Sequence, residues 1–159
     1  MAARIEPLLT VADLDACPDD NNRYELIEGE LFVSRARGIP HQLVVNNLQM
    51  ALGNYLKDNP IGTVVPGAGA IFSDYDAVIP DLAFVLNERW DRVVTGEKFT
   101  GALDLVIEVV SAGPENRLVE VYRLRGNRLE STATLRNGDE IITALLPGFR
   151  MPVKLVFAL

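Results

Sequence analysis

Two short apolar runs in the middle of the chain predict strands that each carry one carboxylate. The first covers residues 78–86 and contains Asp81, and the second covers residues 104–110 and contains Glu108. Both runs are rich in β-branched residues and are bounded by turn-forming residues, which is typical of buried strands. A buried, ionised carboxylate costs several kcal/mol of stability unless a partner offsets it. Each of the two acids is therefore expected to have a cationic partner.

The residue pattern leaves two interpretations of these acids open. If the two strands lie side by side, Asp81 and Glu108 face one point and can hold Mg²⁺ or Mn²⁺, which prefer oxygen ligands. Alternatively, Asp81 only begins a strand and Glu108 pairs with an arginine, as most lone buried acids do.

The pattern in the rest of the N-terminal part predicts one long helix and a hairpin. Apolar residues recur at helical spacing over residues 41–57, which gives one apolar stripe for packing on a sheet. Residues 23–34 predict two strands that turn at Glu28-Gly29. Around them the pattern predicts a short helix at 9–14 capped by Thr10 and Asp13, a bent edge strand at 63–73, a short helix or turn at 87–94 with Trp90 over the core, and a loop at 95–101.

The C-terminal part of the sequence predicts antiparallel strands throughout, and its Asn137-Gly138 pair is the strongest hairpin signal of the chain. The strands are expected at 118–123, 129–135, 139–144 and 153–157. No segment has the composition of a linker, so we expect one domain, 1–159, with a core at about 23–111 and C-terminal strands at 118–159.

Composition and charge limit the expected partners and compartment. The net charge of −7 and a count of three lysines argue against broad affinity for nucleic acid, which needs a basic face. No apolar run approaches the roughly 18 residues that span a bilayer, so no membrane partner is expected. Cys17 is the only cysteine, which excludes an internal disulfide and agrees with the reducing cytoplasm.

Several catalytic classes lack the residues they need. His41 is the only histidine, which excludes a zinc site built from histidines, and no Gly-x-Ser-x-Gly motif is present. The glycine pair at 67–69 has neither a third glycine nor a Walker lysine, so a nucleotide loop is not expected. What remains is an oxygen-ligand site built on Asp81 and Glu108, with these candidates for supporting groups: His41, Glu25, Glu28 and Glu30.

His41 and the hairpin glutamates each have a functional and a structural interpretation. His41 follows Pro40 at the predicted start of a helix, where the helix dipole favours a neutral, proton-accepting imidazole. A histidine simply exposed at a helix end explains the same pattern. Strand alternation puts Glu25 on one face and Glu28 on the other, so the hairpin glutamates cannot all point to one site.

Four motifs, in order and in approximate register from about Leu9 to Asn116, resemble one family. The chain is similar to the Uma-type putative restriction endonucleases of the PD-(D/E)XK nuclease superfamily. Residues 118–159 also resemble the C-terminal strands of that family. The four motifs lie at residues 24–31, 40–42, 80–85 and 105–111.

The resemblance implies a restriction-endonuclease-like fold of class α+β or α/β, with a mixed β-sheet core flanked by helices, an N-terminal hairpin and C-terminal antiparallel strands. It implies a Mg²⁺ or Mn²⁺ site with Asp81 and Glu108 as metal ligands, and His41 and Glu30 as further catalytic groups. Such a metal polarises the scissile phosphate and lowers the pKa of an attacking water.

The sequence departs from the family after the second acid. The superfamily usually carries a lysine two residues after the glutamate, a position that Val110 occupies here, and no lysine lies between Lys98 and Lys154. Compared with that family, the chain looks as if roughly 20–30 residues, enough for a helix and a strand, had been excised after Asn116. Either this is a natural deletion or the sequence omits a segment. Such a deletion would expose a sheet edge, so we expect a homodimer in which a partner chain closes it.

Two functions follow as expectations. The first is a metal-dependent endonuclease that hydrolyses DNA phosphodiester bonds through the Asp81–Glu108 pair. The second is a catalytically inactive nuclease-fold relative that acts as a binding or assembly module. The carboxylate pair favours the first, and the missing lysine and the acidic balance favour the second.

Overall fold

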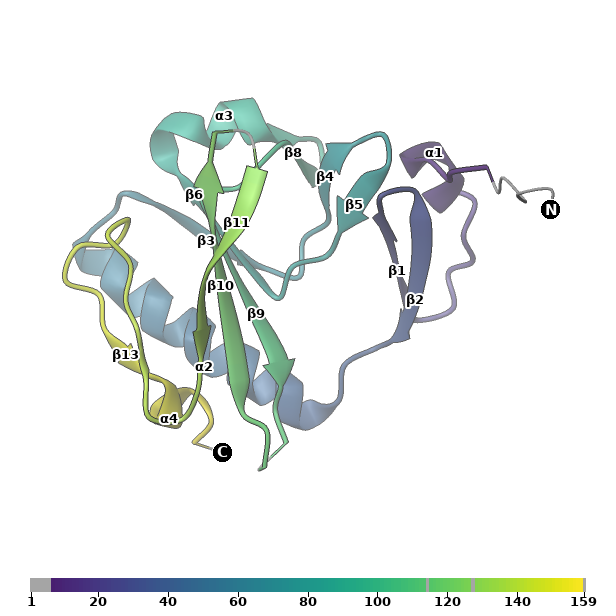
Figure 1. Ribbon diagram of the computed structural model, residues 1–159. Coiled ribbons are helices and arrows are strands. Elements are labelled where there is room, and N and C mark those ends of the chain that lie inside the picture. Colours follow the sequence, from purple (N-terminus) through teal and green to yellow (C-terminus); the bar gives the residue numbers. More distant parts are fainter. Residues whose placement is uncertain (1–6, 114, 127, 159) are drawn as a thin grey trace, which may run out of the picture.

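The computed structural model describes residues 7–113, 115–126 and 128–158. Most of its elements are strands, and α2 is by far the longest helix (Figure 1). In chain order the elements are α1 (Val11–Leu14), β1 (Asn22–Ile27), β2 (Glu30–Arg35), α2 (Ile39–Asp58), β3 (Gly62–Pro66), β4 (Ala70–Ser73), β5 (Asp76–Val78), β6 (Leu82–Leu86), the 3₁₀ turn η1 (Asn87–Arg89), α3 (Trp90–Val93), β7 (Val94–Thr95), β8 (Lys98–Thr100), β9 (Leu105–Ser111), β10 (Leu118–Arg125), β11 (Arg128–Leu135), β12 (Glu140–Ile141), β13 (Met151–Pro152) and α4 (Val153–Val156).

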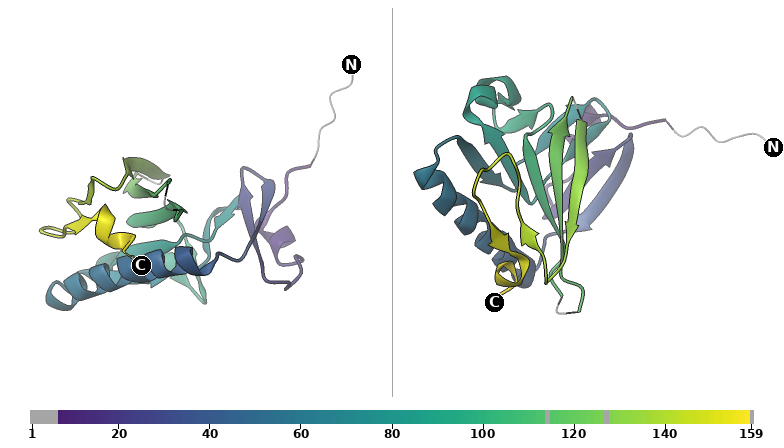
Figure 2. Two further views of the ribbon diagram at one scale, coloured as in Figure 1. Left: turned by 90° about the horizontal axis from the view of Figure 1, so that it is seen from below. Right: turned by 60° about the vertical axis from the view of Figure 1, so that its left-hand side comes forward.

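The strands form two larger sheets and one small one. The central sheet has the order β11-β10-β9-β6-β3, and all of its neighbouring strands are antiparallel. The second sheet has the order β2-β1-β5-β4-β8-β7 and contains a parallel pair, β4 and β8. The mixed character predicted for the fold therefore lies in this second sheet. In Figure 2 the β1–β2 hairpin projects away from the body of the molecule, on the side opposite the C-terminal segment.

Both faces of the central sheet are buried, which explains the uninterrupted apolar runs of its inner strands. On one face, side chains of β6, β9 and β10 pack against α2 and α4. On the other face a smaller cluster joins Ala83, Val85 and Val106 to Val93 and Phe99. The alternation along β9 sends Ile107 and Val109 toward α2 and Glu108 toward the opposite face.

The strongest local patterns predicted their elements correctly. The helix expected at 41–57 is α2, which buries five residues along one stripe. The hairpin of β1 and β2 turns at Glu28 and Gly29, both with positive φ, and α1 carries the predicted capping interaction from the Thr10 backbone N–H to Asp13 Oδ2 at 2.7 Å. Strands β6 and β9 are direct neighbours, which meets the condition under which the two acids can face one point.

The first acid-bearing run is not one continuous strand. Residues 76–78 form β5 in the second sheet, and β6 begins only at Leu82 in the central sheet. Pro80 lies between them and cannot donate a backbone hydrogen bond to a strand ladder, so the chain leaves one sheet there and enters the other. The expected bend at 63–73 is a similar crossing, because β3 and β4 belong to different sheets and Gly67 between them has φ +60°.

Three further expectations were wrong. The loop predicted at 95–101 is a short hairpin of β7 and β8. The strand predicted at 153–157 is the helix α4 followed by its C-cap residue Phe157, and Val153, Val156 and Phe157 are buried against the central core. The Asn137-Gly138 turn does not connect a hairpin, because β12 pairs with β13 rather than with β11. Short apolar runs fit either a strand or a helix until their packing partners are known.

The position beside β9 is occupied within the chain. Strand β10 pairs with β9 on the side opposite β6, so β9 is a fully paired inner strand. The edges of the central sheet are β3 and β11. The homodimer was expected because a deletion would leave an unpaired sheet edge. Among the described strands, β9 has no such edge, and the homodimer stays a prediction. Among the described helices, none combines the length and the apolar character needed to cross a membrane.

The close packing of β3 against β6 in the central sheet can be tested by a substitution at Gly62. A Cβ atom at Gly62 would overlap with the Phe84 ring and with the carbonyl oxygen of Val85. We expect Gly62→Ala to lower the free energy of unfolding by about 1–3 kcal/mol, since overpacking forces neighbouring groups to shift. Urea denaturation measures the change.

Gly53→Ala is the matched control. Gly53 lies within α2, and a Cβ there meets no atom within 4 Å. Alanine favours the helix over glycine, so this variant should gain about 0.5–1 kcal/mol. Equal stability of the two variants would contradict the β3–β6 packing described above.

Candidate active site

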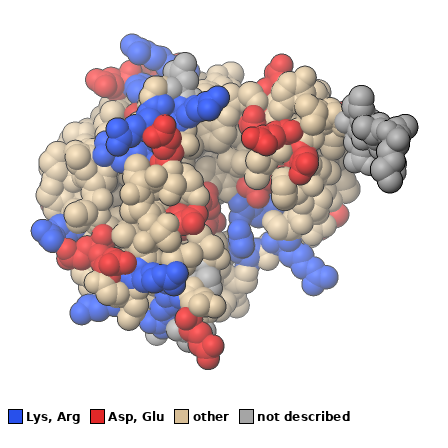
Figure 3. Space-filling model, in the orientation of Figure 1, with Lys and Arg blue, Asp and Glu red and all other residues tan. Residues whose placement is uncertain are grey.

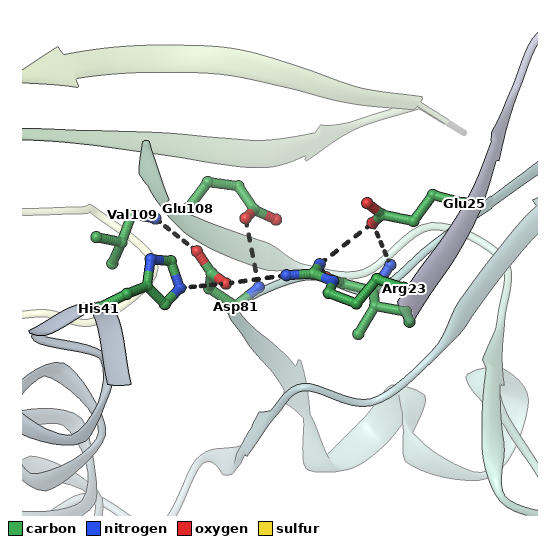
Figure 4. A network of polar contacts seen from close by, with 7 residues as sticks. Arg23, Glu25, His41, Asp81, Glu108 and Val109 are labelled. Atoms are coloured by element: carbon green, nitrogen blue, oxygen red, sulfur yellow. Dashed lines mark hydrogen bonds and ion pairs between the residues drawn. The ribbon is translucent and has the colours of Figure 1, made fainter. Parts of the chain in front are cut away.

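Asp81 lies where the chain crosses from one sheet to the other, and it is only 6% exposed. Its Oδ1 accepts a hydrogen bond from Nε2 of His41 at 2.9 Å, and its Oδ2 accepts one from the backbone N–H of Val109 at 2.8 Å (Figure 4). Nη1 of Arg23 is 3.7 Å from Oδ1. Asp81 is thus fixed by groups from β1, α2 and β9, and its negative charge has a partner.

Glu108 lies on β9 beside Asp81 and has a different environment. Its Oε2 accepts one long hydrogen bond, 3.4 Å from the backbone nitrogen of Asp81. Burial raises the pKa of Glu108 to about 8, with further contributions from the negative charge of Asp81 and from a side-chain hydrogen bond with it. Among the described residues no cation lies within 4 Å of Glu108, so the expected arginine partner is found at Asp81 instead.

Arg23 and Glu25 complete the network from the hairpin side. One guanidinium nitrogen of Arg23 donates to the carbonyl oxygen of Ile79 and also contacts Oε1 of Glu25 at 3.3 Å. The same carboxylate oxygen accepts the backbone N–H of Ile79 at 2.8 Å. Arg23 and Glu25 therefore attach the hairpin to the backbone that leads into Asp81. Sequence reasoning missed Arg23, although its two-residue spacing from Glu25 puts both side chains on one face of β1.

The structure brings together three of the four predicted site residues. His41 is buried in the first turn of α2 and faces Asp81, so the alternative of a surface histidine was wrong. Glu30 is exposed at the start of β2, and no hydrogen bond or ion pair in the described part of the chain joins it to Asp81 or Glu108. Glu25, which was weighed only as a supporting group, is the hairpin glutamate that reaches the site.

A cleft of about 340 Å³ opens beside Asp81. Two arginines, Arg23 and Arg37, line it together with Gln42, and its floor includes Pro80 and Asp81. Figure 3 shows basic and acidic side chains close together in the groove between the hairpin side and the body of the molecule. The cleft therefore offers hydrogen-bond donors and positive charge next to a buried carboxylate.

The donor set fits a hard divalent cation that needs few protein ligands. In the described residues no group of three or more His, Cys, Asp or Glu side chains is arranged to hold a metal ion. Mg²⁺ is commonly held by one or two carboxylates, with waters and substrate phosphates as the other ligands. Two adjacent carboxylates match that requirement, and one of them, Glu108, has a raised pKa and no cation within 4 Å in the described part of the chain.

Comparisons with known proteins agree with this geometry. The model of the family described as Uma2, putative restriction endonuclease, matches residues 11–118. That match contains Arg23, His41, Asp81 and Glu108, and it ends at the first residue of β10. A search of curated proteins found no match.

A solved structure shows the same fold at low sequence identity. It is the crystal structure of a putative nuclease of the DUF820 family from Anabaena variabilis, with a TM-score of 0.67 and 16% identity. The similarity covers 94% of this chain and 98% of the other. The chain thus has a nuclease fold, as the sequence predicted.

The raised pKa of Glu108 predicts a change of stability with pH. The folded protein keeps a proton on Glu108 up to about pH 8, whereas an unfolded chain releases it near its ordinary pKa of 4.5. The folded state binds more protons between these values, so its stability decreases as pH rises through this window. Without divalent cations, Glu108→Gln should therefore raise the free energy of unfolding at pH 9 and change it little at pH 4.

The expected gain at pH 9 is on the order of a few kcal/mol, because one pKa unit corresponds to about 1.4 kcal/mol. Urea denaturation at both pH values measures it. Glu97→Gln, in the exposed turn between β7 and β8, is the control. A Glu108→Gln effect that is equal at the two pH values would contradict the proposed protonation.

Proposed function

Because the chain belongs to the Uma2 family of putative restriction endonucleases, we propose that it is a metal-dependent endonuclease that hydrolyses DNA phosphodiester bonds at the Asp81–Glu108 pair. Family membership and the nuclease fold support a nuclease. The more specific proposal, a metal-dependent reaction at the carboxylate pair, rests on the environment of Glu108. A partly buried carboxylate beside a second carboxylate, with no cation partner among the described residues, is best explained by a divalent cation.

Asp81 and Glu108 are the residues that would hold the cation. When bound, the cation supplies positive charge that polarises the scissile phosphate and lowers the pKa of an attacking water. Glu108 has to lose its proton to act as a ligand, and the nearby charge makes that loss favourable. In the hydrolysis, the water oxygen bonds to phosphorus, a phosphorus–oxygen ester bond breaks, and the leaving oxygen takes up a proton.

His41 and the backbone N–H of Val109 have a positioning role in this proposal. They bind the two oxygens of Asp81 from opposite elements, which leaves the carboxylate little freedom to rotate. Each carboxylate oxygen can accept more than one partner, so both oxygens keep capacity for a further ligand. A pre-oriented ligand lowers the entropy cost of binding the cation.

The cleft supports a phosphodiester as the substrate. Arg23 and Arg37 line it beside Asp81, and guanidinium groups bind phosphate oxygens with two parallel hydrogen bonds. Because the net charge is −7, a broad basic face for DNA is not expected. Contact with the substrate is therefore limited to this cleft.

One observation favours an inactive binding module as the second candidate. Val110 takes the usual lysine position and is 47% exposed. The described lining of the cleft contains no lysine, and Lys98 lies 3.7 Å from Asp15 instead. A protein that kept the fold but lost turnover would have this pattern.

Cleavage of supercoiled plasmid and of a short duplex, in Mg²⁺ and in Mn²⁺, tests the proposal. We expect cleavage by the unmutated chain, its loss on chelation, and a decrease of at least ~100-fold in both Asp81→Asn and Glu108→Gln. These substitutions keep side-chain size, so circular dichroism should show an intact fold. Glu97→Gln should cleave at the unmutated rate.

Two results would contradict the proposal. Cleavage that survives in both site variants would place the activity elsewhere. An intact, unmutated protein that cleaves neither substrate would favour the binding module.

A further inference from the structure

We infer that Arg23 supplies the positive charge that the missing lysine would otherwise provide, and that its guanidinium binds a phosphate oxygen of the substrate. The inference rests on the proposed nuclease function. It assigns a catalytic role to a residue on β1, outside the strand that carries Glu108.

The position of Arg23 fits this role. Its side chain is 15% exposed, lines the cleft and approaches Asp81 Oδ1 to 3.7 Å. In the described part of the chain it is the one Lys or Arg side chain within 4 Å of either acid of the pair. The other well-buried arginine pair, Arg89 with Asp104 at 2.8 Å, belongs to the connection around η1.

The guanidinium of Arg23 has unused hydrogen-bonding capacity. Arginine has five N–H donors. One terminal nitrogen donates to Ile79 and contacts Glu25, and the other has, among the described residues, only the long contact to Asp81. The Nε atom is buried without a hydrogen-bond partner. Among the described residues, the terminal nitrogen next to Asp81 therefore keeps donor capacity, and a phosphate oxygen in the cleft would use it.

A structural role explains part of the same geometry. The contacts of Arg23 to Ile79 and Glu25 hold the hairpin against the crossing at Pro80. If that were its whole purpose, removal of the guanidinium would disturb Asp81 and weaken both metal binding and turnover. If Arg23 acts on the substrate, its removal leaves the metal site intact and relieves the repulsion between the guanidinium and the bound cation.

The two roles therefore predict opposite changes in metal binding. We expect Arg23→Gln to bind Mn²⁺, without DNA, as tightly as the unmutated protein or more tightly, as measured by calorimetry. We expect the same variant to lose ~100-fold or more in kcat/KM, which is typical of a removed charge-stabilising donor. Arg23→Lys should recover much of the rate, because it restores the charge. Arg92→Gln, an exposed arginine of α3, is the control and should behave like the unmutated chain.

Duplex binding in Ca²⁺ gives a readout without turnover. Arg23→Gln should bind about tenfold more weakly than the unmutated protein and the Arg92→Gln control, with a smaller salt dependence, since one phosphate contact is lost. If the unmutated protein does not cleave, the proposed nuclease function is wrong. In that case the binding measurement alone shows whether Arg23 contacts a phosphate.

The inference is overturned by any of three results. Arg23→Gln could cleave at the unmutated rate. It could lose Mn²⁺ binding together with cleavage, without rescue by Arg23→Lys. In a chain that does not cleave, it could bind the duplex as tightly as the unmutated protein does.

Discussion

The buried carboxylate of Asp81 is the point on which the site depends. Its backbone lies between β5 in one sheet and β6 in the other, and its side chain is bound by groups from α2, β1 and β9. The same residue thus connects the hairpin, the long helix and the central sheet. Removing the negative charge of Asp81 would weaken its hydrogen bonds with His41 and Val109 and its contact with Arg23, so these groups depend on one another.

Glu108, next to Asp81, is buried in an environment that disfavours its charged form. A carboxylate with a pKa of about 8 is neutral in the free protein over most of the physiological range. Its protonated form lets it lie next to Asp81 without like-charge repulsion, and the proposed cation would reverse this preference. Under the proposed function, stability of the free protein and cation binding are therefore opposed at this one side chain.

The sequence was most informative where one local pattern determines one element. The apolar stripe of α2 and the Glu28-Gly29 turn could be predicted from spacing alone. Spacing also identified the two acid-bearing runs, whereas their adjacency was only a condition that the structure meets. Pairing of Glu108 and Asp81 followed from that adjacency. The motifs that resemble the nuclease family also gave the fold correctly.

The prediction errors arose where contacts between residues far apart in the sequence determine the local structure. Pro80 marks a change of sheet, but only the pairing of β5 with β1 and β4 shows that two sheets exist. The segment after Pro152 becomes helical because its apolar side chains pack on the core shared with α2. Arg23 reaches Asp81 across 58 positions of sequence, so no local pattern identifies it as a site residue. The contact of Glu25 with the backbone of Ile79 depends on tertiary packing in the same way.

The short connection between β9 and β10 brings a second acidic side chain close to Glu108. It lets β10 pair directly with β9, and the register puts Glu120 opposite Glu108 on the same face of the sheet. The hydroxyl of Tyr122 donates to Glu120 at 2.5 Å, and the pKa of Tyr122 is raised to about 12 by that bond first, then by burial and by the charges of Glu120 and Glu108.

Acidic side chains thus lie on both sides of Glu108, one on β10 and one beside β6. The side of the sheet formed by β10 supplies no cation close to Glu108 among the described residues, whereas β1 brings Arg23 to the other side of the pair. Arg23 therefore brings positive charge to this otherwise acidic site from the opposite side. The N-terminal hairpin is the described element that brings it.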